Sequence, residues 1–497
     1  MSGNIRKEFG DYQTPINFCK QVCMYVRENY MKSPTAIIEP TCGVGNFLKA
    51  AAITFDCQNL YGIEINSHYT LKAKKSVPKA IIVNANIFET DTRQLCNADN
   101  NVLVIGNPPW ATNSNLDYNL PEKVNFKGLR GIEALTGASN FDICEYIILQ
   151  LLSEYKNTNS TICMLCKTSV ARNVLLEIER NNILCNRIEI LNFNSNKIFG
   201  ISASACVFII SLNQSHKTSG YTVCSIKDFD TQKSIDTLNV ANGMITSESI
   251  RYDFAGKCQL TWRQGVKHDC GRIMELELKN DTFVNKLGEH VHIENSRVFP
   301  LVKSSHFKRP IINSFKKYVI VTQDSPKQDT KYIQRELPLT WQYLNLHNNE
   351  FLDRKSIIYK STPPFSMFGV GDYSFAPYKV GVSGFYKTPL FCLLYSEKPV
   401  MTDDTAYFLA FNDYDIAYSV MLLLNSPKVQ EFLISIAFLD NKRPYTVKLL
   451  SRLDFIKCLD SVSLEELLET ENKFGLDSRV SATHLKQLRE YISSFIK

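Results

Sequence analysis

The chain has 497 residues, of which 44% are hydrophobic and 21% are charged, and its formal net charge is +6. A chain of this length exceeds one typical core, so we expect two or three domains. The composition is that of a water-soluble globular protein, and apolar runs such as 205–210 are far too short to cross a bilayer. The first eight residues contain no apolar signal core, so we expect a cytoplasmic protein that contacts no membrane.

The first predicted element is a helix that follows a turn. Thr14 is a suitable N-cap residue, and Pro15 suits the first helical position. We expect the helix to run to about Tyr30, with Phe18 and Val22 on its buried face.

A glycine loop follows the first predicted strand, 36–39. Glu39 ends that strand, and Pro40-Thr41-Cys42-Gly43-Val44-Gly45 leads into a helix. Such a unit lets backbone approach a ligand closely and directs a helix N-terminus at it. The second strand ends in Glu64, about twenty residues after the loop, where an acid accepts hydrogen bonds from a ribose. A dinucleotide fingerprint requires a third glycine where this chain has Leu48, so the pattern favours an adenosine-type cofactor over a nicotinamide.

The most specific stretch is Asn107-Pro108-Pro109-Trp110, at the end of the apolar strand 102–106. Prolines cannot donate to a sheet ladder, so the strand stops here, and each proline holds the residue before it extended. The result is a rigid rim at a carboxyl strand end, where ligands bind in open α/β sheets. The Asn107 amide, the Pro108 carbonyl and the Trp110 ring together suit a planar ring with an exocyclic amino group.

The rest of the first half alternates strands and helices. We expect strands over 80–83, 161–166, 188–192 and 206–212, and helices over 143–155 and 170–180. The polar stretch 111–140 interrupts the pattern and has the length of a functional lid. The alternation is typical of α/β folds, and we expect this domain to close by about residue 240.

The fifteen cysteines are scattered along the chain. Cys163 and Cys166 form one C-x-x-C pair without a second pair, which is poor evidence for zinc. We therefore expect reduced thiols that pack as small hydrophobes. Asp403-Asp404-Thr405 lacks a ligand partner at suitable spacing, so we expect a turn there and no metal.

From residue 241 to 497 the alternating pattern is lost, and short strands, basic clusters and aromatic residues dominate. Prolines and glycines between 363 and 384 predict β-rich packing, and helices return over 414–424, 428–437 and 464–497. The basic excess is compatible with a polyanion. The candidate phosphate or base contacts are Lys303, Lys308, Arg309, Arg354, Lys355, Lys360, Lys379, Lys442 and Arg443.

The glycine loop from Glu39 to Gly45, the acid Glu64 and the tetrad Asn107–Trp110, in this order, resemble DNA adenine-N6 methyltransferases of restriction–modification systems, and more narrowly their gamma class. In that class the cofactor motif precedes the catalytic motif, and the target-recognition domain is C-terminal. The resemblance implies an α/β, Rossmann-like catalytic domain over 1–240 and a mixed, β-rich DNA-recognition domain with a helical end over 241–497. It also implies S-adenosylmethionine as cofactor and double-stranded DNA as partner, with no metal required for methyl transfer.

The resemblance assigns the cofactor contacts residue by residue. Thr14 matches the family's contact to the methionine side of the cofactor, and Glu39, Gly43 and Gly45 match its glycine loop. Glu64 matches the ribose-binding acid. Asn86 stands where the family usually has an aspartate that reads the cofactor's adenine amino group, and an amide can still accept that hydrogen bond.

The resemblance likewise assigns the catalytic residues. Asn107 and the Pro108 carbonyl would accept from both hydrogens of an adenine amino group, and Pro109 would stiffen the rim. Trp110 and Phe199 match the two aromatic residues that sandwich a flipped-out base. An amino group held in this way faces the activated methyl group, which is catalysis by positioning and preorganisation.

Other interpretations stay open. Asn-Pro-Pro-aromatic sites also occur in enzymes resembling protein-glutamine methyltransferases, and cytosine-N4 methyltransferases use similar chemistry, although Asn107 in the first position favours adenine. A non-catalytic DNA-specificity subunit is a third interpretation, which the intact tetrad and glycine loop argue against. The sequence shows no nuclease constellation, so we expect any cognate endonuclease to be a separate chain.

Overall fold

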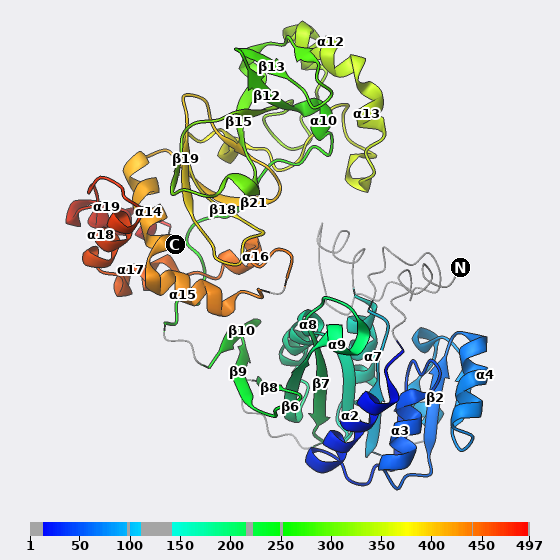
Figure 1. The fold of residues 1–497 in the computed structure, drawn as a ribbon. Coiled ribbons are helices and arrows are strands. Elements are labelled where there is room, and N and C mark those ends of the chain that lie inside the picture. Colours follow the sequence, from blue (N-terminus) through cyan, green and yellow to red (C-terminus); the bar gives the residue numbers. More distant parts are fainter. Residues whose placement is uncertain are drawn as a thin grey trace. The chain divides into compact units, whose positions relative to one another are not determined.

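The computed structural model describes residues 13–96, 100–110, 142–214, 222–248, 252–439 and 441–495, and the expected lid at 111–140 lies outside these ranges. The chain divides into two compact units, Met1–Ser249 and Ile250–Lys497, and each has its own sheets (Figure 1). The division falls after β10, a few residues beyond the position near 240 expected from the sequence, because the strands on both sides of residue 241 belong to the sheet of the first unit.

In the part of the chain that the structure describes, the first unit is built on a ten-stranded sheet of order β10-β9-β8-β6-β7-β5-β4-β1-β2-β3. Neighbours among β3, β2, β1, β4 and β5 are parallel, whereas β7 is antiparallel to both β5 and β6. The carboxyl ends of the five parallel strands therefore meet at one edge. The strands are β1 (Ala36–Glu39), β2 (Leu60–Glu64), β3 (Ile81–Asn84), β4 (Val102–Gly106), β5 (Thr161–Lys167), β6 (Cys185–Phe193), β7 (Ala205–Leu212), β8 (Thr222–Asp228), β9 (Ser234–Ala241) and β10 (Met244–Ser247).

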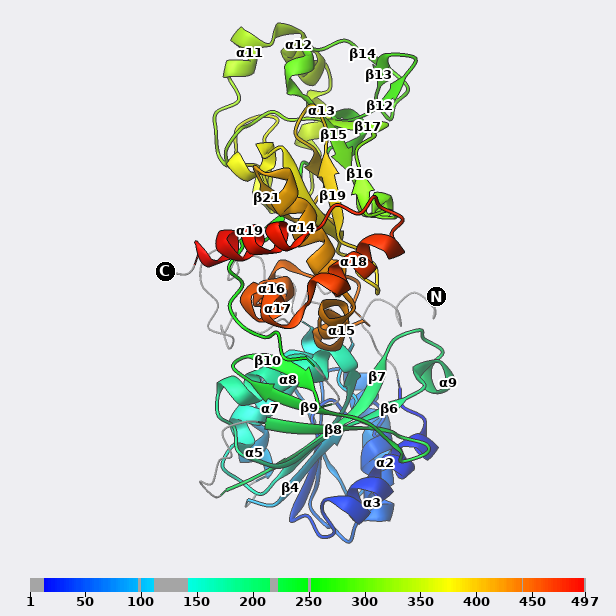
Figure 2. The ribbon, with the colours of Figure 1, turned by 90° about the vertical axis from the view of Figure 1, so that its left-hand side faces the viewer.

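Helices cover both faces of this sheet. Figure 2 shows α2 and α3 on one face and α5, α7 and α8 on the other. Strands covered on both faces are continuous apolar runs, and every residue of β1 and β4 is buried accordingly. The helices are α2 (Ile16–Asn29), α3 (Asn46–Thr54), α4 (Ser67–Ser76), α5 (Thr92–Cys96), α7 (Ile143–Tyr155), α8 (Thr168–Arg180) and α9 (Ser195–Phe199), with a 3-10 turn, η1 (Ile87–Glu89).

The prediction that Thr14 caps the first helix is wrong. Helix α2 begins at Ile16, its N-cap residue is Pro15, and no side chain caps it. Pro15 is extended (φ −59°, ψ 136°), so the proline takes the flanking non-helical position and Thr14 lies one residue too early. Thr14 is instead buried, and its carbonyl accepts from Asn46 Nδ2 at 2.8 Å.

The second unit contains two further sheets among its described residues, of order β14-β13-β12-β17-β15-β20 and β11-β21-β18-β19-β16. Both mix parallel and antiparallel neighbours. The strands are β11 (Arg263–Gln264), β12 (Glu275–Lys279), β13 (Thr282–Val284), β14 (His290–Val291), β15 (Val298–Val302), β16 (Ile311–Ile312), β17 (Lys317–Ile320), β18 (Tyr378–Ser383), β19 (Cys392–Tyr395), β20 (Met401–Thr402) and β21 (Ala406–Phe411).

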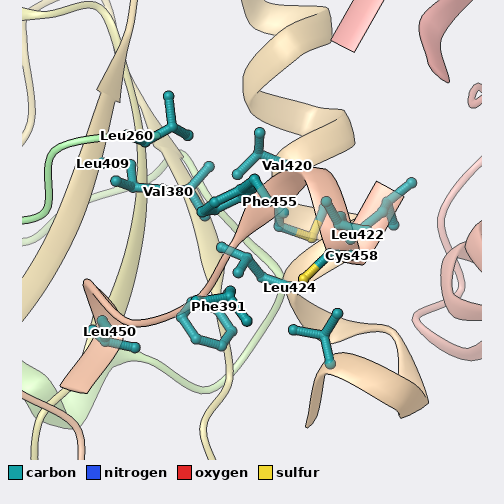
Figure 3. Packing of buried hydrophobic residues seen from close by; sticks show 14 of the residues in the cluster. Leu260, Val380, Phe391, Leu409, Val420, Leu422, Leu424, Leu450, Phe455 and Cys458 are labelled. Carbon is teal, nitrogen blue, oxygen red and sulfur yellow. The ribbon is translucent and has the colours of Figure 1, made fainter. Parts of the chain in front are cut away.

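Helices at the end of the chain pack on the second of these sheets. Val380 of β18, Leu409 of β21, Val420 and Leu424 of α14, and Phe455 of α17 belong to one buried cluster (Figure 3). The helices are α10 (Gly271–Met274), α11 (Tyr332–Glu336), α12 (Pro338–Leu346), α13 (Asn348–Leu352), α14 (Tyr414–Asn425), α15 (Pro427–Ile436), α16 (Val447–Leu450), α17 (Phe455–Ser461), α18 (Leu464–Lys473) and α19 (Ala482–Ser493).

The helical tail expected over 464–497 is two helices, because Gly475 adopts a left-handed φ of +64° after α18. The expected turn at Asp403 is confirmed, since Asp403 Oδ1 accepts from Thr405 N at 3.2 Å. All fifteen cysteines are free thiols, and all but Cys185 and Cys258 are buried. Within the described ranges no helix is long and apolar enough to span a membrane.

Candidate active site

The carboxyl edge of the parallel strands brings the two sequence motifs side by side. β1 lies between β4 and β2, so the glycine loop after β1 is flanked by the tetrad after β4 and by Glu64 at the end of β2. The approach is close at Gly106, where an added Cβ would lie 3.3 Å from Glu39 Cγ. A side chain at position 106 would therefore press on the strand that carries the glycine loop.

Left-handed glycines shape the loop itself. Gly43 has a φ of +51° and Gly45 has a φ of +84°, a region that residues with a Cβ rarely adopt. The Gly43 N–H donates to Glu64 Oε2 at 2.8 Å, which connects the loop to the end of β2. An added Cβ on Gly43 would lie 2.7 Å from Gln13 Oε1, so the Gln13 amide covers this face of the loop.

The segment before α2 is tied to the same loop. Gln13 Oε1 accepts from the Val44 N–H at 3.3 Å, and Asn46 at the start of α3 donates to the Thr14 carbonyl. The structure therefore brings together Thr14, the loop and Glu64, as expected. The contact made by Gln13 was missed, although its position directly before Thr14 in the chain was a usable signal.

Two buried acids lie at this edge. Glu39 is buried, and this burial, with the nearby Glu64 carboxylate, raises the pKa of Glu39 well above its usual range. The Leu48 N–H opposes the shift by donating to Glu39 Oε2 at 3.2 Å. Glu64 Oε1 accepts from the Asn66 N–H at 2.8 Å, so both Glu64 oxygens hold backbone groups in place. Glu39 thus holds the start of α3, which follows the loop, whereas Glu64 holds the loop itself at Gly43.

Asn86 follows β3, next to the end of β2. Its Oδ1 accepts from the Phe88 N–H at 3.1 Å and caps η1, and its Nδ2 lies 3.3 Å from Glu89 Oε1. Capping fixes the side chain and uses one lone pair of the amide oxygen. The second lone pair remains for the contact to the cofactor that the sequence predicts.

Two aromatic rings meet beside the tetrad. Trp110 and Phe199 have ring centroids 5.5 Å apart and an interplanar angle of 73°, and Phe199 also contacts Phe193 at 6.1 Å. Trp110 is 7% exposed, and its indole N–H donates to the Leu165 carbonyl at 3.3 Å. Sequence reasoning paired the two rings but missed Leu165, since a backbone acceptor leaves no mark on residue identity.

The nine basic candidates of the second unit fall into three groups: one is buried, three contact other residues of the unit, and five are exposed. Lys379 is fully buried, so the prediction that it contacts DNA is wrong for this residue. Lys303 pairs with Glu275 at 2.8 Å, Arg443 donates to the Asp404 carbonyl at 3.0 Å, and the Arg354 guanidinium stacks on Tyr359 at 3.8 Å. The exposed members are Lys308, Arg309, Lys355, Lys360 and Lys442.

Among the residues that the structure describes, no group of three or more His, Cys, Asp or Glu side chains has the geometry to hold a metal ion. The polar groups of the site are instead an amide, proline and backbone carbonyls, backbone N–H groups and two acids. The chemistry of this set suits hydrogen bonds to an amino group and to an adenosine-like ligand.

The fold and the paired motifs at its carboxyl edge define a Rossmann-like methyltransferase with an additional mixed, β-rich unit, which confirms the expected fold class. The solved structure of the type IIL restriction-modification enzyme MmeI in complex with DNA matches 99% of this chain and 77% of that chain, with a TM-score of 0.51 at 13% identity. No family model matches the chain.

A relative identifies the family. The type II methyltransferase M.NspV of Nostoc sp. is 37% identical over 478 residues, which cover 91% of this chain and 98% of that protein. The chain belongs to the type II methyltransferases of restriction–modification systems.

Gly43→Ala is expected to weaken cofactor binding about tenfold. The added Cβ would displace the Gln13 amide, which accepts from the Val44 N–H, so the loop would have to shift before the cofactor binds. A tenfold loss of affinity corresponds to about 1.4 kcal/mol. Isothermal titration calorimetry with S-adenosylmethionine measures the change. Gly200→Ala is the matched control, because Gly200 also has a positive φ (+71°) but an added Cβ there meets nothing within 4 Å. Equal affinities for Gly43→Ala and wild type would contradict the role of the loop.

Proposed function

We propose that this protein is a site-specific DNA methyltransferase that transfers a methyl group from S-adenosylmethionine to N6 of a flipped-out adenine. The observation that carries the proposal is the juxtaposition, on neighbouring strands, of the Asn107-Pro108 rim and the glycine loop. One motif suits an exocyclic amino group and the other suits an adenosine-type cofactor, so a donor and an acceptor of the methyl group would meet at one edge. Membership of the type II methyltransferases supports the same reaction class.

The residues of the loop fit S-adenosylmethionine. Gly43 and Gly45 hold the loop in left-handed conformations that suit glycine, and Glu64 stands at the end of β2 with its carboxylate oriented by two backbone N–H groups. Thr41 Oγ1 is buried and makes no hydrogen bond to any described residue, so the loop offers an additional polar atom. Thr14, Glu39 and Asn86 complete the set that we assign to the cofactor. When bound, the cofactor supplies an electrophilic methyl group on a sulfonium.

Asn107 and Pro108 would hold the acceptor. The lone pair of an adenine amino group is delocalised into the ring, so this nitrogen is a poor nucleophile. If Asn107 Oδ1 and the Pro108 carbonyl accept both N–H hydrogens, the lone pair turns towards the methyl group. Pro109 stiffens the rim, since it fixes its own φ and restricts Pro108. This is catalysis by positioning and preorganised electrostatics.

The target nitrogen cannot be reached inside duplex DNA, so the base must leave the stack at a cost of a few kcal/mol. Stacking on aromatic side chains contributes about 1–3 kcal/mol per base in single-strand binders. We assign that contact to Trp110 and Phe199. Their ring contact at 5.5 Å supports a shared aromatic site and requires one ring to move when a base enters.

We assign catalysis to residues 1–240 and target recognition to residues 241–497. The second unit has its own sheets and core, and it presents exposed basic residues such as Lys308, Lys355 and Lys442 for contact with the DNA backbone. The partner that we propose is double-stranded DNA. Methyl transfer of this kind requires no metal.

The test is the identity of the methylated product. Protein is incubated with methyl-labelled S-adenosylmethionine and DNA of mixed sequence, and the DNA is digested to nucleosides. We expect label in N6-methyldeoxyadenosine. Label in N4-methyldeoxycytidine or in protein glutamine would overturn the adenine assignment. Absence of label from every fraction, with DNA binding intact, would favour a non-catalytic specificity subunit.

A further inference from the structure

The indole of Trp110 donates to a backbone carbonyl of β5 that would normally accept from the neighbouring strand. Trp110 Nε1 donates to the Leu165 carbonyl at 3.3 Å, and Cys144 Sγ of α7 lies 3.8 Å from the same oxygen. Trp110, Leu165 and Cys144 are all buried. A buried carbonyl needs a donor, which in a sheet is normally an N–H of the neighbouring strand.

The register of the sheet shows which residue of the neighbouring strand should donate to the Leu165 carbonyl. Along β5 and its flanks, successive residues bond alternately to the two neighbouring strands. The Ser160 carbonyl accepts from the Leu212 N–H, and the Thr168 N–H donates to the Ser204 carbonyl, so even-numbered residues face β7. The Asn159 N–H instead donates to the Asn100 carbonyl just before β4. Odd-numbered residues of β5 therefore face β4. The last ladder pair is Gly106 with Met164, which places Leu165 opposite Asn107.

The expected donor for Leu165 is absent for a chemical reason. Bonds between parallel strands are slanted, so the carbonyl opposite Asn107 should accept from the next residue of the β4 chain. That residue is Pro108, which has no N–H. The proline that builds the rim thus removes the donor that the neighbouring strand requires, and the Trp110 indole N–H takes its place.

We propose that this hydrogen bond makes Trp110 the fixed wall of the base site, so that a base enters by displacing Phe199. The proposal rests on the proposed function, since it concerns how the flipped adenine is received. It gives the indole N–H a positioning role that a phenylalanine at the same position would lack.

Phe199 has the properties of the ring that moves. It has no polar atom to anchor it, and it ends the five-residue helix α9 just before Gly200, whose φ is +71°. With the ring centroids 5.5 Å apart, no base fits between Trp110 and Phe199, because each stacked pair needs about 4.5 Å or more. Trp110 is held to the central sheet by a polar bond, whereas Phe199 is held by ring contacts.

Replacement of the indole N–H by sulfur tests the positioning role. We would incorporate 3-benzothienylalanine at position 110, which keeps the bicyclic ring, and expect kcat for adenine methylation to fall about fivefold with the affinity for S-adenosylmethionine unchanged. The same replacement at Trp262 is the control, because this indole is buried in the core cluster of the second unit and is not among the site residues assigned here. An unchanged kcat at position 110 would overturn the positioning role.

Hydrogen exchange of the indole tests which ring moves. The Trp110 N–H resonance is assigned by its loss in Trp110→Phe, and its exchange is measured with and without DNA that carries 2-aminopurine at the target base. We expect the N–H to remain protected while 2-aminopurine fluorescence reports the flipped base. Fast exchange on flipping would show that Trp110 moves and would overturn the proposal. A wild-type protein that makes no N6-methyladenine would count against the proposed function instead.

Discussion

Asn107→Ala is expected to reduce methyl transfer to adenine about a thousandfold and to leave the affinity for S-adenosylmethionine within about twofold of wild type. Loss of one preorganised group at the reacting centre costs about 10²–10³ in kcat, and here the lost amide is also the group that orients the amino nitrogen. Asn107 directly follows β4, whereas the glycine loop follows the neighbouring β1 and Glu64 ends β2. Single-turnover transfer and calorimetry separate the two effects.

The control for this variant lies at the other end of the same strand. Asn101 directly precedes β4, and its side chain donates to the Ser33 carbonyl at 3.0 Å, far along the strand from the rim. Asn101→Ala should therefore transfer methyl groups at the wild-type rate. Transfer by Asn107→Ala within tenfold of wild type would show that the amide is not the acceptor we assign.

Glu189→Ala is expected to destabilise the first unit by about 3 kcal/mol. Glu189 is fully buried on β6 and accepts from the hydroxyls of Tyr25 and Tyr30 at 2.5 and 2.8 Å. It also pairs with Arg187 at 2.9 Å and with Lys227 at 2.8 Å. Removal of the carboxylate leaves partly buried donors without their acceptor. Breaking a buried ion pair typically costs about 3–5 kcal/mol, and the partial exposure of these donors favours the lower end. Urea denaturation at pH 7 measures the loss.

The contribution of Glu189 should vanish in acid. Burial alone would raise its pKa, but Lys227, the two tyrosine hydroxyls and Arg187 outweigh burial and lower the pKa to about 2. Because this value lies below that of an unfolded glutamate, about 4.3, the carboxylate stabilises the fold above that pH and ceases to do so as the pH falls towards 2. The stability difference between wild type and Glu189→Ala should therefore shrink below about pH 4.

An exposed glutamate provides the comparison. Glu28 lies on α2, in the same unit, and is exposed. Glu28→Ala should change the free energy of unfolding by less than about 0.5 kcal/mol at any pH in this range. Equal losses of unfolding free energy for the two variants would show that Glu189 stabilises the fold no more than an exposed glutamate does.

The sequence predicted the parts of the site that depend on local chemistry. Proline cannot continue a ladder, and glycine tolerates a left-handed φ, so Pro108 and Gly43 could be placed at the ends of strands from residue identity alone. Short apolar runs that alternate with helical patterns predicted the parallel strands. Asn107, Gly43 and Glu64 meet because parallel strands bring their carboxyl ends to one edge.

Features that depend on distant partners could not be predicted. The acid at position 189 collects donors from α2, β6 and β8, and no local pattern marks it. Lys379 counted as a free positive charge in the sequence, yet its Nζ donates to the Ala376 carbonyl at 3.0 Å inside the second unit. The Leu165 carbonyl became informative only when the register of β4 and β5 was known.

The tight contact between Gly106 and Glu39 has a consequence for genetic dissection of this enzyme. The strand of the amide rim and the strand of the glycine loop are direct neighbours, and an added Cβ at Gly106 would lie 3.3 Å from Glu39 Cγ, so a side chain there would push on both strands. Lesions at this contact should impair donor and acceptor sites together, so their phenotypes cannot be assigned to one ligand. Clean separation of the two half-sites requires substitutions at the tips of the motifs, where each faces its own ligand.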